Sequence, residues 1–104
     1  KTRMNPPPIV DAISQVYAEL RREFSILKSY SIGFIVAGPN GSGYNVSVIS
    51  PADTYYSTNH VCYETALLDD KNNELIYRDE LGYSDVLRHS TINHVRQELQ
   101  RLGC

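Results

Sequence analysis

The sequence predicts an α+β fold in which an antiparallel four-stranded sheet, built from two hairpins, is flanked by an N-terminal and a C-terminal helix. Three observations support this class: apolar residues recur at helical spacing near both ends, short β-rich segments fill the middle, and turn-forming residues separate those segments. A chain of 104 residues has the size of one domain. We therefore expect a single domain over residues 1–104, with the element order α-β-β-β-β-α.

The N-terminal segment combines an extended lead-in with an amphipathic helix. The run Pro6-Pro7-Pro8 favours extended chain followed by a helix start, which predicts a lead-in over residues 1–7. A helix is predicted over residues 8–28, because apolar residues recur there at spacings of three and four. The residues of this stripe are Ile9, Ile13, Val16 or Tyr17, Leu20, Phe24 and Leu27.

The middle of the chain predicts four strands. Residues 31–37 are a continuous apolar run without helix caps, as in a strand buried on both faces. Residues 44–50 alternate between apolar and polar side chains, as in a half-buried strand. The third and fourth strands are predicted over residues 61–68 and 74–78. Because 31–37 and 61–68 look apolar on both faces, we expect either one helix on each face of the sheet or a second chain over the open face.

The connections and the last helix follow from local signals. Residues 51–60 are polar and aromatic and predict a loop, whereas residues 69–73 are rich in Asp and Asn, which tolerate the left-handed region of a turn. Residues 79–84 predict a second loop, and residues 86–89 a short strand or turn. The chain then ends in a predicted helix, marked by a cap, an apolar stripe and a terminal glycine: Ser90 or Thr91, Ile92, Val95, Leu99, Leu102 and Gly103.

Residues 38–43, with the sequence GPNGSG, place two glycines at the spacing of a phosphate-binding Walker A loop. Tyr44 and Asn45 stand where that loop needs Lys and Ser or Thr, and the segment that follows has the period of a strand rather than a helix. The pair Asn40-Gly41 instead predicts a hairpin turn, because both residues tolerate φ above zero. We therefore expect a turn here, and no cofactor.

Charge is unevenly placed along the chain. The net charge is −2, and residues 69–85 carry six carboxylates and two cations, a local net charge of −4. The chain lacks the basic footprint of a nucleic-acid binder, so we expect no nucleic-acid partner. No apolar run reaches membrane-spanning length and no charged-then-apolar opening predicts a signal peptide, so we expect no membrane partner. The acidic segment suits a basic protein surface, or a solvated hairpin protected against edge-to-edge pairing.

Candidate catalytic and metal-binding residues form no strong constellation. His60 and Cys62 lie on one side of a predicted strand and Asp53 offers a nearby carboxylate, but a zinc site needs at least three protein ligands. His89 and His94 are five residues apart and do not share a helical face. We expect no catalytic residue and no metal. The two cysteines of the chain are too few for a disulfide framework, which predicts a reducing compartment, the cytoplasm.

Tyrosine is unusually frequent, with eight residues against two phenylalanines and no tryptophan. Tyrosine is enriched at interfaces, although it also favours strands. Together with the acidic segment it predicts a non-enzymatic protein-binding module: an inhibitor, an adaptor or an immunity-type protein that neutralises a toxin. We expect its partner to be a protein with a basic surface, or a second copy in a homodimer. The predicted partner-binding residues are Tyr55, Tyr56, Asp69, Asp70, Glu74, Asp79 and Glu80.

The alternative hypothesis is a small hydrolase or a nucleotide-binding enzyme. It would use His60, Cys62 or Asp53 as reactive groups, or the glycine loop over residues 38–43 as a phosphate site. Under this hypothesis Cys62→Ala or His60→Ala removes an activity and leaves the fold intact.

Overall fold

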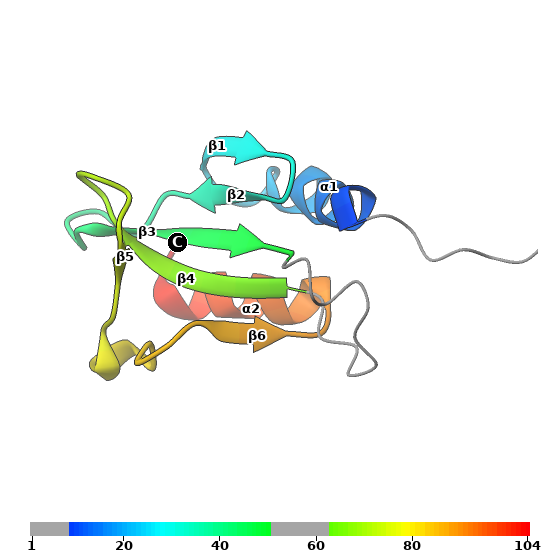
Figure 1. Cartoon of the computed structure of the whole chain (residues 1–104). Helices are drawn as coiled ribbons and strands as arrows, with labels where there is room; N and C mark the ends of the chain where they lie inside the picture. The colour runs from blue at the N-terminus through cyan, green and yellow to red at the C-terminus, as the bar shows by residue number, and fades with distance from the viewer. Residues whose placement is uncertain (1–8, 51–62) are drawn as a thin grey trace, which may run out of the picture.

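Six antiparallel strands and two helices make up the described part of the chain (Figure 1). The structure is a computed structural model that describes residues 9–50 and 63–104. Its elements are α1 (Ile9–Leu20), β1 (Ile26–Tyr30), β2 (Gly33–Val36), β3 (Tyr44–Ile49), β4 (Tyr63–Asp69), β5 (Leu75–Ile76), a 3-10 helix (Asp79–Leu81), β6 (Leu87–His89) and α2 (Ile92–Leu102).

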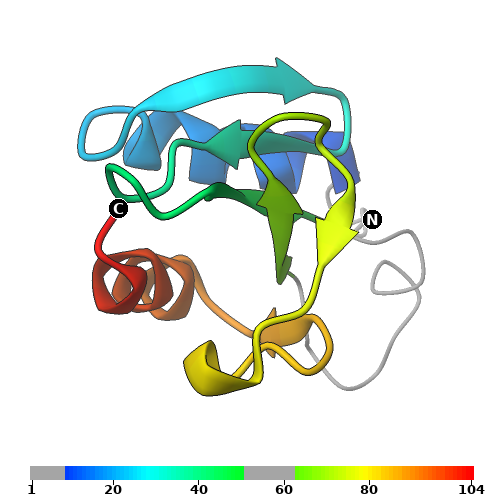
Figure 2. The ribbon, with the colours of Figure 1, turned by 90° about the vertical axis from the view of Figure 1, so that its left-hand side faces the viewer.

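The strands β1, β2, β3 and β4 pair in chain order, each antiparallel to the next. The far side of β4 is shared by two short strands: β5 pairs with Leu67 and Leu68, and β6 pairs with Tyr63, Glu64 and Thr65. One edge of the sheet is therefore β1, and the other is formed by β5 and β6. The sheet twists strongly between β1 and β4 (Figures 1 and 2).

The predicted α+β class, the antiparallel sheet and the two terminal helices are confirmed. The sheet has six strands rather than four, because β1 and β6 join the four that the sequence predicts; β6 falls on the segment 86–89, for which a strand was one of two expectations. The predicted helix over residues 8–28 is too long, since α1 ends at Leu20 and residues 21–24 form a turn.

Tertiary pairing explains why β1 forms where helical spacing continues. Phe24 lies in the turn and packs against the core. Its side chain is therefore partly buried, as the apolar spacing suggests, although the residue is not in a helix. Leu27 lies where the pairing register shifts between Ile26 and Lys28, and 57% of Leu27 is exposed. Hydrogen bonding of β1 to β2 across the short turn at residues 31–32 supplies backbone partners that a continued helix would have to provide internally.

The core lies on one face of the sheet. Opposite one another across β2, β3 and β4 are Val36, Val46 and Leu67, and all three are fully buried. Because directly opposed residues share a face, this row marks the face on which the helices pack. Figure 2 shows α2 to one side of β3 and β4. Both helices bury side chains in the same cluster: Ile13, Val16 and Leu20 from α1, and Val95, Leu99 and Leu102 from α2.

The opposite face carries neither described helix, so the expectation of one helix on each face is wrong (Figures 1 and 2). β2 is buried on both faces as predicted, whereas β4 alternates between buried and half-buried residues. On the open face Ile35 is buried, and Ala66 and Leu68 are half-buried. Within the described residues, the exposed large apolar side chains lie at the edges of the sheet instead.

Local signals define α2 and the β4–β5 turn as predicted. The Thr91 hydroxyl accepts the His94 backbone N–H at 3.1 Å and caps α2, and Gly103 ends the helix with φ +88°. Asn73 adopts φ +60° in the turn, as expected of an Asn in this position. Within residues 9–50 and 63–104, no helix has the length and apolarity needed to cross a membrane.

Candidate functional site

The glycine loop is a hairpin connection. It joins the antiparallel strands β2 and β3, and the segment after it is a strand, so it lacks the helix N-terminus that a phosphate loop uses. The Ser42 N–H donates to the Pro39 carbonyl oxygen at 3.0 Å, and Gly41 adopts φ +76°. Asn40 does not adopt positive φ, so the turn uses Gly41 rather than both residues of the predicted pair. The Gly38 N–H is held by the Asn45 side-chain oxygen at 3.1 Å.

Most of the reactive groups that the sequence singles out lie outside the described residues. This applies to Asp53, His60 and Cys62, and also to the predicted partner contacts Tyr55 and Tyr56. Within the described ranges, no three His, Cys, Asp or Glu side chains gather closely enough to hold a metal ion.

The C-terminal cysteine is a poor nucleophile. Burial and the nearby Glu98 carboxylate raise the pKa of the Cys104 thiol to about 11. A thiol with this pKa is protonated at neutral pH, and the thiolate is the reactive form. Cys104 instead packs against the core, and its N–H donates to the Leu99 carbonyl oxygen at 3.0 Å.

A chain of polar side chains is buried between the sheet and α2. The Tyr83 hydroxyl lies 2.7 Å from Glu98 Oε2 and 2.7 Å from Thr65 Oγ1. Thr65 Oγ1 also lies 2.8 Å from His89 Nε2, and Arg101 Nε donates to Glu98 Oε1 at 2.8 Å. Thr65 and Tyr83 are almost completely buried, and Glu98 is 9% exposed. We call these five residues the buried polar network.

Proton counting fixes the direction of every bond in this network. Tyr83 has one hydroxyl proton, which it donates to the Glu98 carboxylate. Thr65 must then donate its own proton to the Tyr83 oxygen. With that proton used, Thr65 Oγ1 can only accept from His89, so His89 carries its proton on Nε2. The network therefore runs as a directed chain from the imidazole to the carboxylate.

The pKa values of the network match its hydrogen bonds. Burial raises the pKa of the Glu98 carboxyl, but hydrogen bonds from Arg101 and Tyr83 more than offset burial and hold that pKa below its ordinary value. Burial raises the pKa of the Tyr83 phenol well above its ordinary value, so Tyr83 remains a donor at neutral pH. Burial lowers the pKa of His89. At neutral pH the network therefore holds an ionised carboxylate and a neutral imidazole.

We expect the fold to lose stability as pH falls from neutral through the ordinary histidine pKa of 6.5, because of His89. The folded state holds the pKa of His89 below its ordinary value of 6.5, so the unfolded chain binds more protons across this range. The contribution of His89 to stability is complete above the pKa that it has in the unfolded chain. It is lost as pH falls towards the lower pKa that His89 has in the folded protein. Urea denaturation at a series of pH values measures the effect.

Substitutions assign this pH dependence to one histidine. His89→Gln keeps an N–H donor but does not titrate, so it should flatten the stability profile over that range. His94→Gln removes a charge that helps to lower the pKa of His89, so it should reduce the pH dependence without abolishing it. An unchanged profile in His89→Gln would contradict the assignment.

The buried polar network also positions the surface next to it. Arg101 Nη2 donates to the Leu81 carbonyl oxygen at 2.8 Å, which ties the 3-10 helix to α2. The network was not predicted from the sequence. One signal was available: Glu98 falls in the apolar stripe of α2, three residues after Val95 and next to Leu99. A charged residue within such a stripe indicates a buried, paired carboxylate.

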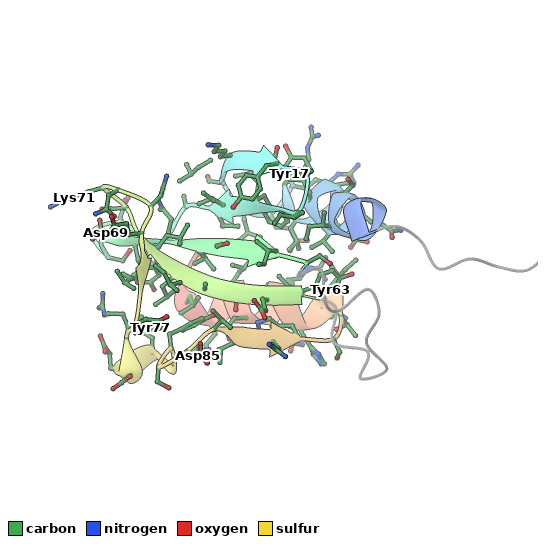
Figure 3. The ribbon with its side chains drawn as sticks, in the orientation of Figure 1. Tyr17, Tyr63, Asp69, Lys71, Tyr77 and Asp85 are labelled. Carbon is green, nitrogen blue, oxygen red and sulfur yellow. The ribbon has the colours of Figure 1, made fainter. Side chains whose placement is uncertain are left out.

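Carboxylates gather at the end of the molecule formed by the β4–β5 turn and the 3-10 helix. Figure 3 shows Asp69, Lys71 and Tyr77 at this end. Asp69 accepts the Lys71 N–H at 2.8 Å within the turn, and Arg78 pairs with Glu80 at 2.6 Å. The hydrogen bond from Arg78 lowers the pKa of Glu80. The other carboxylates of this end, Asp70, Glu74 and Asp79, are exposed and form no ion pair with a described residue.

Two large apolar side chains are exposed between these carboxylates. Leu75 of β5 is 46% exposed and Tyr77, which follows it, is 55% exposed. They separate the acidic turn from the acidic 3-10 helix along the chain. We call this surface the acidic edge; it consists of Asp69, Asp70, Glu74, Leu75, Tyr77, Asp79 and Glu80.

The β4–β5 connection and the 3-10 helix, which carry the five predicted acidic contacts, lie at one end of the molecule (Figure 1), and Leu75 and Tyr77 are exposed between them along the chain. Comparison with known proteins adds no assignment: no protein family, no curated protein and no solved structure matches this chain.

Proposed function

We propose that the chain is a small non-enzymatic protein-binding module that recognises a basic surface of another protein through its acidic edge. The classes that fit are an inhibitor, an adaptor or an immunity-type protein that neutralises a toxin. The observation that carries the proposal is the exposure of Leu75 and Tyr77 among carboxylates. Apolar and aromatic anchors surrounded by charged groups are typical of binding surfaces.

The composition of the acidic edge assigns different roles to its parts. Exposed carboxylates attract a cationic partner over a Debye length and raise the association rate, while adding little to the final affinity. Tyr77 offers a broad ring and a hydroxyl on a side chain with few rotatable bonds. Binding therefore costs little side-chain conformational entropy at Tyr77. We therefore assign affinity to Tyr77 and Leu75, and the association rate to the carboxylates.

The acidic edge is held in place before a partner arrives. The Arg101–Leu81 hydrogen bond fixes the 3-10 helix, and the Asp69 and Asn72 side chains accept backbone N–H groups within the turn. A pre-ordered surface loses less conformational entropy on binding. This supports recognition by a rigid surface rather than by folding on contact.

Capture from source-cell lysate tests the proposal with two matched variants. The edge variant carries Asp70→Asn, Glu74→Gln and Asp79→Asn. The control variant carries Glu19→Gln, Glu23→Gln and Glu64→Gln, which changes the net charge equally at other places. Because these residues pair with Arg96 and Arg88, urea denaturation first checks that the control variant is folded. We expect the wild type and the control to recover the same protein at low salt, and the edge variant to recover much less of it.

Kinetics with the purified partner then separate the two roles. The edge variant should lower the association rate constant and flatten its salt dependence. Tyr77→Ala should instead raise the dissociation rate and weaken Kd by about thirtyfold, as expected for a loss of about 2 kcal/mol at an anchor residue. Equal capture by the edge variant and the wild type, or an unchanged salt dependence, would overturn the proposal.

A further inference from the structure

The exposed large apolar side chains of the described residues fall into two groups, at opposite edges of the sheet. Leu75 and Tyr77 belong to the acidic edge. The second group is on β1 and the turn after it: Leu27, Tyr30 and Ile32. Large apolar groups concentrated at two sites, on a surface that exposes no others within the described ranges, indicate two contact surfaces rather than one.

The second edge has the opposite charge. Arg21 and Arg22, in the turn that leads into β1, and Lys28 on β1 are exposed and form no ion pair with a described residue. The two acidic residues closest to them along the chain, Glu19 and Glu23, pair with Arg96 instead. We call the group Arg21, Arg22, Leu27, Lys28, Tyr30 and Ile32 the basic edge.

The basic edge also has unused backbone. β1 pairs with β2 on one side, and no described strand lies on its other side. The outward N–H and C=O groups of β1 are therefore available to a further strand, as in β-strand addition. β5 likewise pairs with β4 on one side only.

A pocket opens beside the basic edge. It has a volume of about 230 Å³ and lies between α1 and the β1–β2 hairpin, where Tyr17 and Phe34 supply aromatic walls and Ser14 and Ser29 supply hydroxyl groups. Aromatic walls with hydroxyl groups nearby suit a tyrosine side chain, which has an apolar ring and a polar tip. Such pockets commonly receive the anchor residue of a partner.

We propose that this chain associates head to tail with itself, the acidic edge of one copy docking on the basic edge of the next, with Tyr77 in the pocket beside β1. The inference rests on the proposed binding role of the acidic edge, and it names the basic surface as one that the chain itself presents. The charges select this arrangement. Two basic edges would repel each other, and so would two acidic edges. An acidic edge and a basic edge attract each other.

The geometry sets the strength and the form of the association. β5 contributes two residues and β1 five, so any shared ladder is short, and we expect a small interface. We therefore expect weak, reversible association that salt suppresses. The two contact surfaces differ, so the interface is heterologous and builds open chains or rings rather than a closed two-fold dimer.

Charge reversal at each edge tests the inference by sedimentation velocity at low salt, from micromolar to millimolar protein. One variant carries Arg21→Glu, Arg22→Glu and Lys28→Glu, and the other carries Asp70→Lys, Glu74→Lys and Asp79→Lys. We expect the wild type to associate with increasing concentration and each variant alone to weaken association at least tenfold. An equimolar mixture of the two variants should associate again, because each then meets an edge of opposite charge.

The mixture also serves as the folding control, since only folded variants can restore the contact. A third variant, Ser14→Phe, fills the pocket without changing charge and should weaken wild-type association. Three results would overturn the inference: a wild type that stays monomeric throughout, a reversed variant that associates as strongly as the wild type, or a mixture that stays monomeric. Capture of a different protein that depends on the acidic edge would then leave the proposed function standing without self-association.

Discussion

Tyr83→Ala is expected to lower the free energy of unfolding by about 3–5 kcal/mol. Tyr83 is 1% exposed and belongs to the core cluster, so truncation opens a cavity beneath the sheet. The same change removes the donor to Glu98 and the acceptor for the Thr65 hydroxyl. A loss of this size is a large part of the stability of a small domain. Urea denaturation at neutral pH measures it.

Two further substitutions separate packing from hydrogen bonding. Tyr83→Phe keeps the ring, so its expected loss of about 1–3 kcal/mol reports the unpaired polar groups alone. Tyr77→Ala truncates a tyrosine that is 55% exposed and should change stability by less than about 0.5 kcal/mol. If Tyr83→Phe were as stable as the wild type, the two hydrogen bonds of the Tyr83 hydroxyl would contribute nothing to stability.

Gly38→Ala is expected to lower the free energy of unfolding by about 3 kcal/mol, the upper end of the range for overpacking. A Cβ at this position would lie 1.9 Å from the Tyr44 carbonyl oxygen, which is a backbone atom of β3 and cannot rotate away. The β2–β3 hairpin would have to open to admit the methyl group. Thermal and urea denaturation of the variant measure the loss.

Gly41→Ala provides the comparison within the same loop. Gly41 has φ +76°, but a Cβ there would meet nothing within 4 Å. Its expected cost is the strain of a left-handed alanine alone, about 1 kcal/mol. The order of the two losses is the test: a loop in which Gly41→Ala is more damaging than Gly38→Ala would not be the hairpin connection described above.

The helix cap, the helix terminus and the turn could be predicted from the sequence because each depends on residues adjacent in the chain. The Thr91 cap, the Gly103 terminus and the left-handed Asn73 each depend on one residue and the backbone next to it. β1 could not be predicted in this way. Residues 24 and 27 continue a helical period, and only pairing with β2 makes an edge strand the better structure. Strand formation depends on pairing with another strand, here the one that follows after a two-residue turn, and the spacing of apolar residues does not report such pairing.

The candidate site was likewise predicted only in part. The acidic residues of the edge were predicted from their density between positions 69 and 85, because charge is visible in composition. Tyr77 could not be distinguished from the other seven tyrosines in the sequence. Its exposure results from its position directly after the two-residue strand β5, which only the structure shows. The buried polar network joins Thr65, Tyr83 and Glu98 from three separate segments, and no spacing in the sequence relates them.

The meander of the sheet has a consequence for how the chain folds. From β1 to β5 each strand pairs with the next along the chain, so hairpins can close while the ends of the chain are still far apart. The ion pairs of Arg96 with Glu19 and Glu23 instead join residues 77 and 73 positions apart. Contacts of such separation carry the largest loop-closure entropy and are expected to form last, after the hairpins have supplied the surface on which α1 and α2 meet.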